Sequence, residues 1–174
     1  KPMIQFVIEN LSLEANYIFL VRKEHEKKYN ITSLLKVLAP SCKIVIVNKL
    51  TEGAASTTLL AKKIIDNKNP LIIANSDQFI DWNSSKSMYK FMSKKNDAAI
   101  LTFKSIHPKW SYARTDKYGN VLEVAEKKVI SDNATVGVYF WKKGSDYVKY
   151  AKQMIKKNIR VNNEFLTGSL VSFQ

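Results

Sequence analysis

Residues 71–77 read Leu-Ile-Ile-Ala-Asn-Ser-Asp, an apolar run that changes abruptly into three polar residues. A short apolar run bounded by turn residues predicts a strand that is buried on both faces. The strand then leaves the core, and Asp77 presents a carboxylate at the edge of the predicted sheet. Carboxylate oxygens suit Mg²⁺, which usually takes one or two of them from a protein. Asp77 is therefore a candidate metal ligand, against the alternative of a turn or helix-capping aspartate.

The same pattern extends outward in both directions, with apolar runs separated by segments of helical periodicity. We expect further strands at 16–21, 43–47, 98–103, 111–115, 121–124 and 135–141, and helices at 2–10, in the second half of 24–38, and at 54–66, 83–93 and 144–158. Residues 116–120 (Asp-Lys-Tyr-Gly-Asn) are typical of a hairpin turn. Strands that alternate with helices predict a mostly parallel sheet with helices on both faces, to which the hairpin adds antiparallel strands.

Length and composition limit the class of protein. The 174 residues suit one domain, and 45% hydrophobic with 25% charged residues is close to the globular average. The one cysteine, Cys42, excludes a disulfide framework and a cysteine-based zinc site, so we expect a reducing, cytoplasmic environment. Every apolar run is far shorter than the roughly 20 residues of a membrane span.

The net charge of +13 suggests anionic partners: nucleic acid, a membrane surface or small phosphorylated substrates. The lysines are scattered along the polar faces of predicted helices, and there are only three arginines, Arg22, Arg114 and Arg160. Because arginine is the preferred residue for base and phosphate recognition, this pattern favours a solvated basic surface over a specific nucleic-acid site. A basic nucleic-acid-binding module is kept as the non-enzyme alternative.

Two further polar segments are candidates for ligand contact. Gly53-Ala54-Ala55 opens a predicted helix, where small residues let a ligand approach the backbone; a tight loop that enters a helix is the plain alternative. Glu126-Lys127 ends a strand, where the lysine could hold a phosphate, although an exposed ion pair is the commoner explanation.

Taken in order, these segments resemble the sugar-nucleotidyltransferase family, the nucleoside-diphosphate-sugar pyrophosphorylases. The matching motifs are residues 1–4 (Lys-Pro-Met-Ile), 51–57 (Thr-Glu-Gly-Ala-Ala-Ser-Thr), 75–78 (Asn-Ser-Asp-Gln), 110–112 (Trp-Ser-Tyr), 119–121 (Gly-Asn-Val), 126–127 (Glu-Lys) and 134–139 (Ala-Thr-Val-Gly-Val-Tyr). The resemblance implies a three-layer, Rossmann-like fold of the GT-A kind, with a mixed sheet. It also implies similarity to members encoded in capsule and lipopolysaccharide gene clusters.

The family's activity implies a reaction and a role for each matching residue. A sugar-1-phosphate oxygen would attack the α-phosphorus of a nucleoside triphosphate, with Mg²⁺ bound, and pyrophosphate would leave. By resemblance, Asp77 and Lys127 would be catalytic, and Asp77 would hold the metal. The nucleotide would contact Thr51, Gly53, Ala54, Asn75 and Ser76, and the phosphorylated substrate would contact Tyr112, Glu126, Lys127, Gly137, Asn163 and Glu164.

The sequence also departs from the family pattern. The family's glycine-rich signature loop and its first strand would lie before Lys1. We therefore expect a single domain over residues 1–174 that lacks these parts, is inactive alone, and could pair with another copy. A metal-dependent glycosyltransferase is the second enzyme alternative, which the absence of an Asp-x-Asp motif at 75–77 disfavours.

Overall fold

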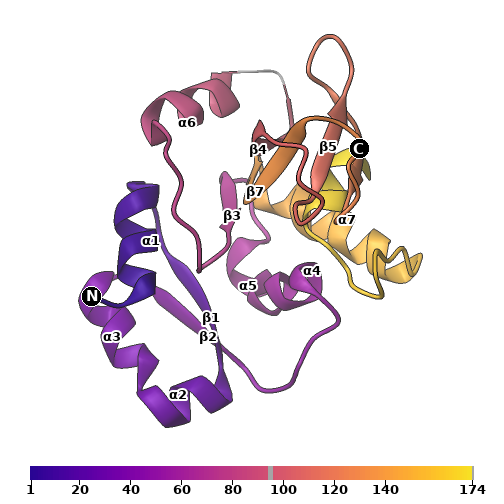
Figure 1. Ribbon diagram of the computed structural model, residues 1–174. Helices are drawn as coiled ribbons and strands as arrows, with labels where there is room; N and C mark the ends of the chain where they lie inside the picture. The colour runs from indigo at the N-terminus through magenta and orange to yellow at the C-terminus, as the bar shows by residue number, and fades with distance from the viewer. Residues whose placement is uncertain (94–95, 174) are drawn as a thin grey trace.

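The computed structural model describes residues 1–93 and 96–173 of the expected domain; residues 94–95 and 174 lie outside the described part (Figure 1). Its strands form two sheets in a mixed α/β arrangement. In the smaller sheet, β1 (Ile18–Arg22) runs parallel to β2 (Lys43–Val47). The larger sheet contains β3 (Leu71–Ala74), β4 (Ala98–Lys104), β5 (Tyr112–Thr115), β6 (Val121–Ala125) and β7 (Asn133–Trp141).

Strand β7 is the centre of the larger sheet. Leu71 of β3 and Ala98 of β4 both pair with Trp141 of β7, so β3 and β4 lie on its opposite edges and are both antiparallel to it. Strands β5 and β6 form the predicted hairpin, and Tyr112 of β5 pairs with Ala134.

The mixed sheet with an antiparallel hairpin is thus confirmed, but the expectation of mostly parallel pairing is wrong. Within the described residues, β1 and β2 make the only parallel pair. Strand β7 lies between β3 and β4, although it follows both of them in the chain.

The helices follow the predicted order, with two interruptions. They are α1 (Met3–Leu11), α2 (Lys23–Tyr29), α3 (Ile31–Leu38), α4 (Ala54–Thr58), α5 (Lys62–Ile65), α6 (Ser84–Ser93) and α7 (Gly144–Lys156), with short 3₁₀ segments η1 (Leu59–Ala61) and η2 (Gly168–Phe173). Asn30, at φ 47°, separates α2 from α3. The helix expected at 54–66 is broken by η1, next to Thr57 and Thr58, whose hydroxyls donate back to the carbonyls of Gly53 and Ala54 and so perturb the turn.

Alternate residues of β3 face two different hydrophobic clusters. Leu71 and Ile73 pack with a cluster built largely from α7 and the C-terminal segment, while Ile72 and Ala74 pack with Val7 and Leu11 of α1. Helices therefore cover both faces of this strand, as the unbroken apolar run predicted.

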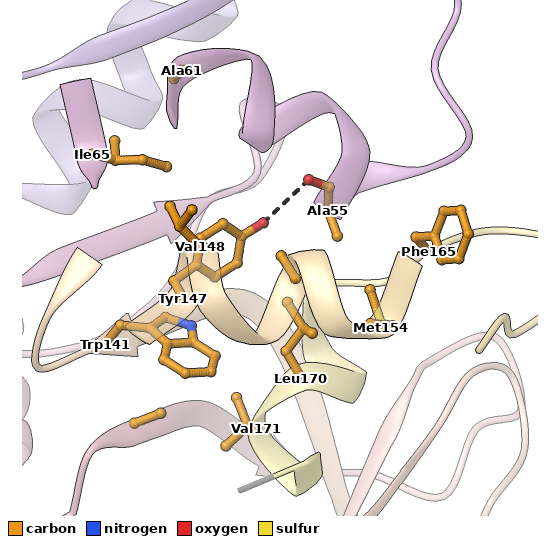
Figure 2. Close-up of a cluster of buried hydrophobic side chains, with 12 residues drawn as sticks. Ala55, Ala61, Ile65, Trp141, Tyr147, Val148, Met154, Phe165, Leu170 and Val171 are labelled. Atoms are coloured by element: carbon orange, nitrogen blue, oxygen red, sulfur yellow. Dashed lines mark hydrogen bonds between the residues drawn. The ribbon is translucent and has the colours of Figure 1, made fainter. Parts of the chain in front are cut away.

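The first cluster, shown in Figure 2, is the main core. It joins Ala55 and Ile65 from the 54–65 region to Trp141, α7 and Phe165. Tyr147 is fully buried there, and its hydroxyl donates to the Ala55 carbonyl at 3.4 Å. In the described part of the chain, no helix is long and apolar enough to cross a membrane.

Candidate active site

The turn after β3 carries the predicted metal ligand. This turn, residues 75–80 (the 75–80 turn), begins where the Asn75 N–H donates to the Gly137 carbonyl at 3.1 Å and so extends the pairing of β3 with β7. Ser76 and Asp77 follow with exposed side chains. The strand end thus places the Asp77 carboxylate at the surface, as its position in the sequence predicted.

Asn10 of α1 fixes the far end of the same turn. Its side-chain amide donates to the Ile80 carbonyl at 2.8 Å and accepts from the Ile80 N–H at 2.8 Å, as a neighbouring strand would. The Trp82 indole N–H also donates to the Asn10 carbonyl at 3.1 Å. Sequence reasoning placed Asn10 on a helix face but gave it no role, because its partners lie 70 residues away along the chain.

Gly137 lies opposite the start of this turn, in a bulge of β7. Ile100 pairs with Tyr139 but Thr102 pairs with Thr135, so β7 has more residues than β4 between these two pairs. Gly137 has φ 73°, and an ideal Cβ on it would overlap the Asn75 side-chain amide and lie 3.1 Å from Gln78 Oε1. Only glycine fits here without displacing these amides, and bulges of this kind are frequent beside active sites.

The predicted base-binding loop, residues 51–55 (the 51–55 loop), lies against the C-terminal segment. The Phe165 N–H donates to the Glu52 carbonyl at 2.8 Å, and the Ala55 N–H donates to the Phe165 carbonyl at 2.9 Å. Between these bonds Gly53 has φ 119°, and an ideal Cβ would lie 2.6 Å from the nitrogen and 2.7 Å from the oxygen of Phe165. Thr51 and Thr57 share a hydroxyl hydrogen bond beside it, and Ala54 is exposed.

Arg160 ties the same two segments together through its side chain. It forms an ion pair with Glu52 at 3.1 Å, donates to the Asn163 carbonyl at 2.9 Å, and lies over the Phe165 ring at 4.1 Å from the ring centroid. No local pattern predicted this role, since Arg160 is separated from Glu52 by 108 residues.

Asn163 and Glu164 belong to a tight turn next to the 51–55 loop. Val161 and Glu164 exchange both backbone hydrogen bonds at 3.0 Å, and Asn162 and Asn163 have φ values of 50° and 65°. Positive φ at both central positions is the hairpin geometry that asparagine tolerates. The structure brings Glu164 close to Gly53, and the side chains of Asn163 and Glu164 are both exposed.

The predicted sugar-phosphate residues surround β7. Lys127 has φ 52° and an exposed side chain, 3.9 Å from the half-buried Glu126 carboxylate. Burial raises the pKa of Tyr139, a hydrogen bond with Thr135 lowers it, and the negative charge of Glu126 raises it further. Tyr139 lies two residues beyond Gly137 on the same strand. Sequence reasoning did not single out Tyr139, which occupies the last position of the 134–139 motif.

Tyr112 occupies a different environment from the other predicted residues. It is completely buried, and its hydroxyl donates to the His107 carbonyl at 2.7 Å. Its contact with a ligand stays a prediction.

Among the described residues, no three His, Cys, Asp or Glu side chains gather as a metal cluster. A cation at the exposed Asp77 would take most of its ligands from phosphate and water. This donor set fits Mg²⁺, which keeps several waters and binds substrate phosphates, and does not fit a fully protein-bound metal.

Comparison with known proteins identifies the family and the fold. The Nucleotidyl transferase family model matches residues 1–167. A nucleoside-diphosphate-sugar pyrophosphorylase from Vibrio cholerae RC9 has a TM-score of 0.73 at 20% identity, over 97% of this chain and 70% of that one. A Bacillus anthracis structure named for glucose-1-phosphate thymidylyltransferase has a TM-score of 0.70 at 16% identity, over 98% and 68%.

A UDP-glucose pyrophosphorylase complexed with UDP-glucose has a TM-score of 0.66 at 15% identity, over 100% of this chain and 75% of that one. At these identities the solved structures show a shared fold. No curated protein sequence matches the chain.

Proposed function

The chain belongs to the nucleotidyl transferase family, and on that premise we propose that it joins a nucleoside triphosphate to a sugar 1-phosphate and releases pyrophosphate. The observation that carries this proposal is the position of Asp77. Its carboxylate is exposed at the end of a strand, beside a β7 bulge at which only glycine leaves room. We place the reaction in the cytoplasm, in the supply of activated sugars for surface polysaccharides such as capsule or lipopolysaccharide.

The reaction brings two anions together, so electrostatics and positioning dominate its energetics. Two like charges about 4 Å apart repel by roughly 4 kcal/mol at an effective dielectric constant near 20. Mg²⁺ at Asp77 would offset part of that repulsion and stabilise the charge that develops on the phosphates. No covalent nucleophile is needed, because the phosphate oxygen of the sugar 1-phosphate itself attacks the α-phosphorus.

The chain's own residues bind and orient the two substrates. The 51–55 loop receives the nucleotide base against a backbone that Phe165 holds in place, while Asn75 and Ser76 contact the nucleotide near Asp77. Lys127 pairs with the phosphate of the sugar phosphate, and its exposed ammonium is free to turn from Glu126 toward a ligand. Glu126 and the Gly137 backbone contact the sugar, with Asn163 and Glu164 completing the substrate side.

We also propose that full activity needs a further strand and a glycine-rich loop that contacts the triphosphate. In the described residues, β1 pairs only with β2, and β3 pairs only with β7, so each has one unpaired edge. Unpaired edges are sites where another strand adds, which supports an additional strand between the two sheets.

A thermal-shift screen tests the proposed function. ATP, CTP, GTP, UTP and dTTP are each added with Mg²⁺, and a ligand at 100 times its dissociation constant should stabilise the chain by about 2.7 kcal/mol. Pyrophosphate release is then measured with a panel of hexose 1-phosphates, for the 174-residue chain and for a version extended by a strand and glycine-rich loop. We expect turnover from the extended version alone; if no triphosphate stabilises that extended version, the proposed function is contradicted.

A further inference from the structure

A pocket of about 280 Å³ lies at the end of the larger sheet that is opposite the 75–80 turn. Its lining comes from three segments that are distant in the sequence: Lys68, Pro70, Met92, Phe140, Lys142 and Lys143. Leu71 pairs with Trp141, so Pro70 and Lys142 follow at one end of this strand pair, while the Asn75 N–H donates to the Gly137 carbonyl at the other end. The pocket is therefore separate from the candidate active site.

The floor and one wall of the pocket are apolar. Phe140 is almost completely buried, and its ring stacks on that of Phe91 of α6 with the centroids 5.7 Å apart. Met92, the next residue of α6, is 58% exposed at the pocket, and Pro70 is also exposed. Methionine adapts its shape to varied partners. An apolar group in the pocket would remove this surface from water, which is favourable.

The rim of the pocket is positively charged. Lys68, Lys142 and Lys143 all have exposed side chains, and within the described part of the chain their ammonium groups form no ion pair or hydrogen bond. None of the described residues that line the pocket is acidic. Asp97 contacts Lys142 through the backbone, where its carbonyl accepts from the Lys142 N–H at 2.7 Å. Three cations thus share one rim, and a bound anion would relieve their repulsion.

Backbone hydrogen bonds hold the segments that carry these lysines together. The Gly144 N–H donates to the Asn69 carbonyl at 2.9 Å, and the Ser145 N–H donates to the Asn67 carbonyl at 2.8 Å. The Asn67 side-chain oxygen also accepts from the Asn69 N–H at 2.8 Å, which fixes the turn between α5 and β3. The fold itself therefore brings the three lysines to one place.

We propose that this pocket binds a soluble phosphate ester with an apolar body. The phosphate lies among the three lysines, and the apolar body lies against Met92 and Phe140. A phosphate ester carries a charge of about −1.5 to −2 at pH 7, which complements three lysines better than the single charge of a carboxylate does. Lysine binds phosphate as a point charge, without the fixed geometry that arginine imposes.

The size of the pocket favours a small molecule over a membrane surface. Its volume is close to the roughly 300 Å³ at the lower end of small-molecule sites, and a short aliphatic or aromatic group would fill it. The inference is independent of the proposed function, because no lining residue belongs to the candidate active site.

Calorimetry on the 174-residue chain tests the inference with hexyl phosphate, inorganic phosphate and hexanol as probes. Vesicles of phosphatidylcholine with phosphatidic acid are tested separately by flotation. The variants are the double substitution Lys142→Gln/Lys143→Gln, Lys68→Gln from a different segment, and Met92→Gln. Lys152→Gln, at an exposed lysine of α7 that does not line the pocket, is the matched control.

We expect hexyl phosphate to bind wild type at least about tenfold more tightly than inorganic phosphate or hexanol, because only hexyl phosphate uses both parts of the pocket. The double substitution should weaken its binding about tenfold, and Lys68→Gln should weaken it by a smaller factor. Met92→Gln should weaken hexyl phosphate about fourfold, the equivalent of one buried methylene, and leave inorganic phosphate unchanged. Lys152→Gln should bind as wild type does.

Four results would overturn the inference. Equal binding of hexyl phosphate and inorganic phosphate would show that the apolar lining contributes nothing. Equal weakening by Lys152→Gln and the double substitution would attribute binding to the overall positive charge. Unchanged binding by the double substitution would place the ligand elsewhere, with Lys127 as the next candidate. Vesicle binding that requires Lys142 and Lys143, without binding of hexyl phosphate, would replace the soluble ligand by a membrane surface.

Discussion

The 51–55 loop follows β2 and the 75–80 turn follows β3, which is the next strand along the chain. The two segments differ in how they are held. In the 51–55 loop, the backbone is hydrogen-bonded on both sides of Gly53 by Phe165, and Arg160 adds an ion pair. In the 75–80 turn, the backbone is fixed at its ends, but Asp77 is exposed and Gln78 Nε2 has no partner in the described chain. The backbone of the first segment is thus held by contacts within the protein, whereas the second presents an exposed carboxylate at the surface.

The largest expected effect tests the exposed carboxylate of the 75–80 turn. In an enzyme that has its triphosphate loop, Asp77→Asn should reduce turnover by about a thousandfold, because a metal ligand acts on charge that develops in the transition state. Stability should not change, since the side chain is exposed. Steady-state kinetics at saturating Mg²⁺ measure this, with Asp81→Asn as the control on a nearby exposed aspartate. Full activity of Asp77→Asn would remove this residue from the mechanism.

Gly53→Ala should destabilise the protein by about 3 kcal/mol, combining a strained φ with overpacking. The new Cβ would lie 2.6 Å and 2.7 Å from Phe165 backbone atoms that are already hydrogen-bonded, so neither can move cheaply. Urea unfolding measures the loss. Gly119→Ala is a control at another positive φ with no atom within 4 Å of the Cβ; equal losses would mean that strain alone, and not Phe165, is responsible.

The free energy of unfolding should fall at alkaline pH because of Tyr147, whose hydroxyl donates to the Ala55 carbonyl at the end of the 51–55 loop. Burial raises the pKa of Tyr147 to about 12 from an ordinary 10.0. The neutral phenol therefore stabilises the fold fully below pH 10, and roughly 3 kcal/mol of stability is lost as the pH rises through 10 toward and beyond 12. Urea unfolding across this range should show a shallower decline for Tyr147→Phe than for wild type. Parallel pH profiles of the two proteins would contradict the assignment.

Gly137→Ala should cost less than Gly53→Ala, about 1.5 kcal/mol, mainly from the positive φ of 73°. The new Cβ would meet the end of the Asn75 side chain, which can rotate away, whereas the Cβ at position 53 would meet a hydrogen-bonded backbone. Because the Gly137 backbone is proposed to contact the sugar, the substitution should also weaken hexose 1-phosphate binding. Urea unfolding measures the loss of stability, and calorimetry on the same samples measures the change in binding. A loss of stability equal to that of Gly53→Ala would contradict the predicted difference between the two segments.

The smallest effect concerns the side-chain support of the 51–55 loop. Arg160→Met should cost about 1 kcal/mol, because the half-exposed ion pair and the contact over the Phe165 ring are each modest. Hydrogen exchange at the Ala55 and Phe165 amides should accelerate. Glu52→Gln removes only the ion pair and should have a smaller effect; equal effects would show that neither the ring contact nor the hydrogen bond to the Asn163 carbonyl contributes.

Part of the candidate site could be predicted from sequence because it depends on local pattern. The bounds of β2 and β3 match the expected strands, and Asp77 is exposed where the apolar run ends. The assignment of Asn163 and Glu164 to the phosphorylated substrate came from family resemblance and stays a prediction. Asn10, Tyr139 and Arg160 were missed, since each acquires its role through atoms that the sequence places elsewhere.

By itself, the sequence determined the α/β class, the order of the strands and helices, and the carboxylate at the end of β3. These follow from apolar runs, helical periodicity and turn residues, all of which act over a few neighbouring positions. Only the tertiary structure decided that β7 lies between β3 and β4, that its bulge brings Gly137 to the Asn75 and Gln78 amides, and that Phe165 holds Gly53. Pairing and close approach depend on contacts between residues far apart in the chain, such as Leu71 with Trp141 and Glu52 with Phe165, which no local pattern encodes.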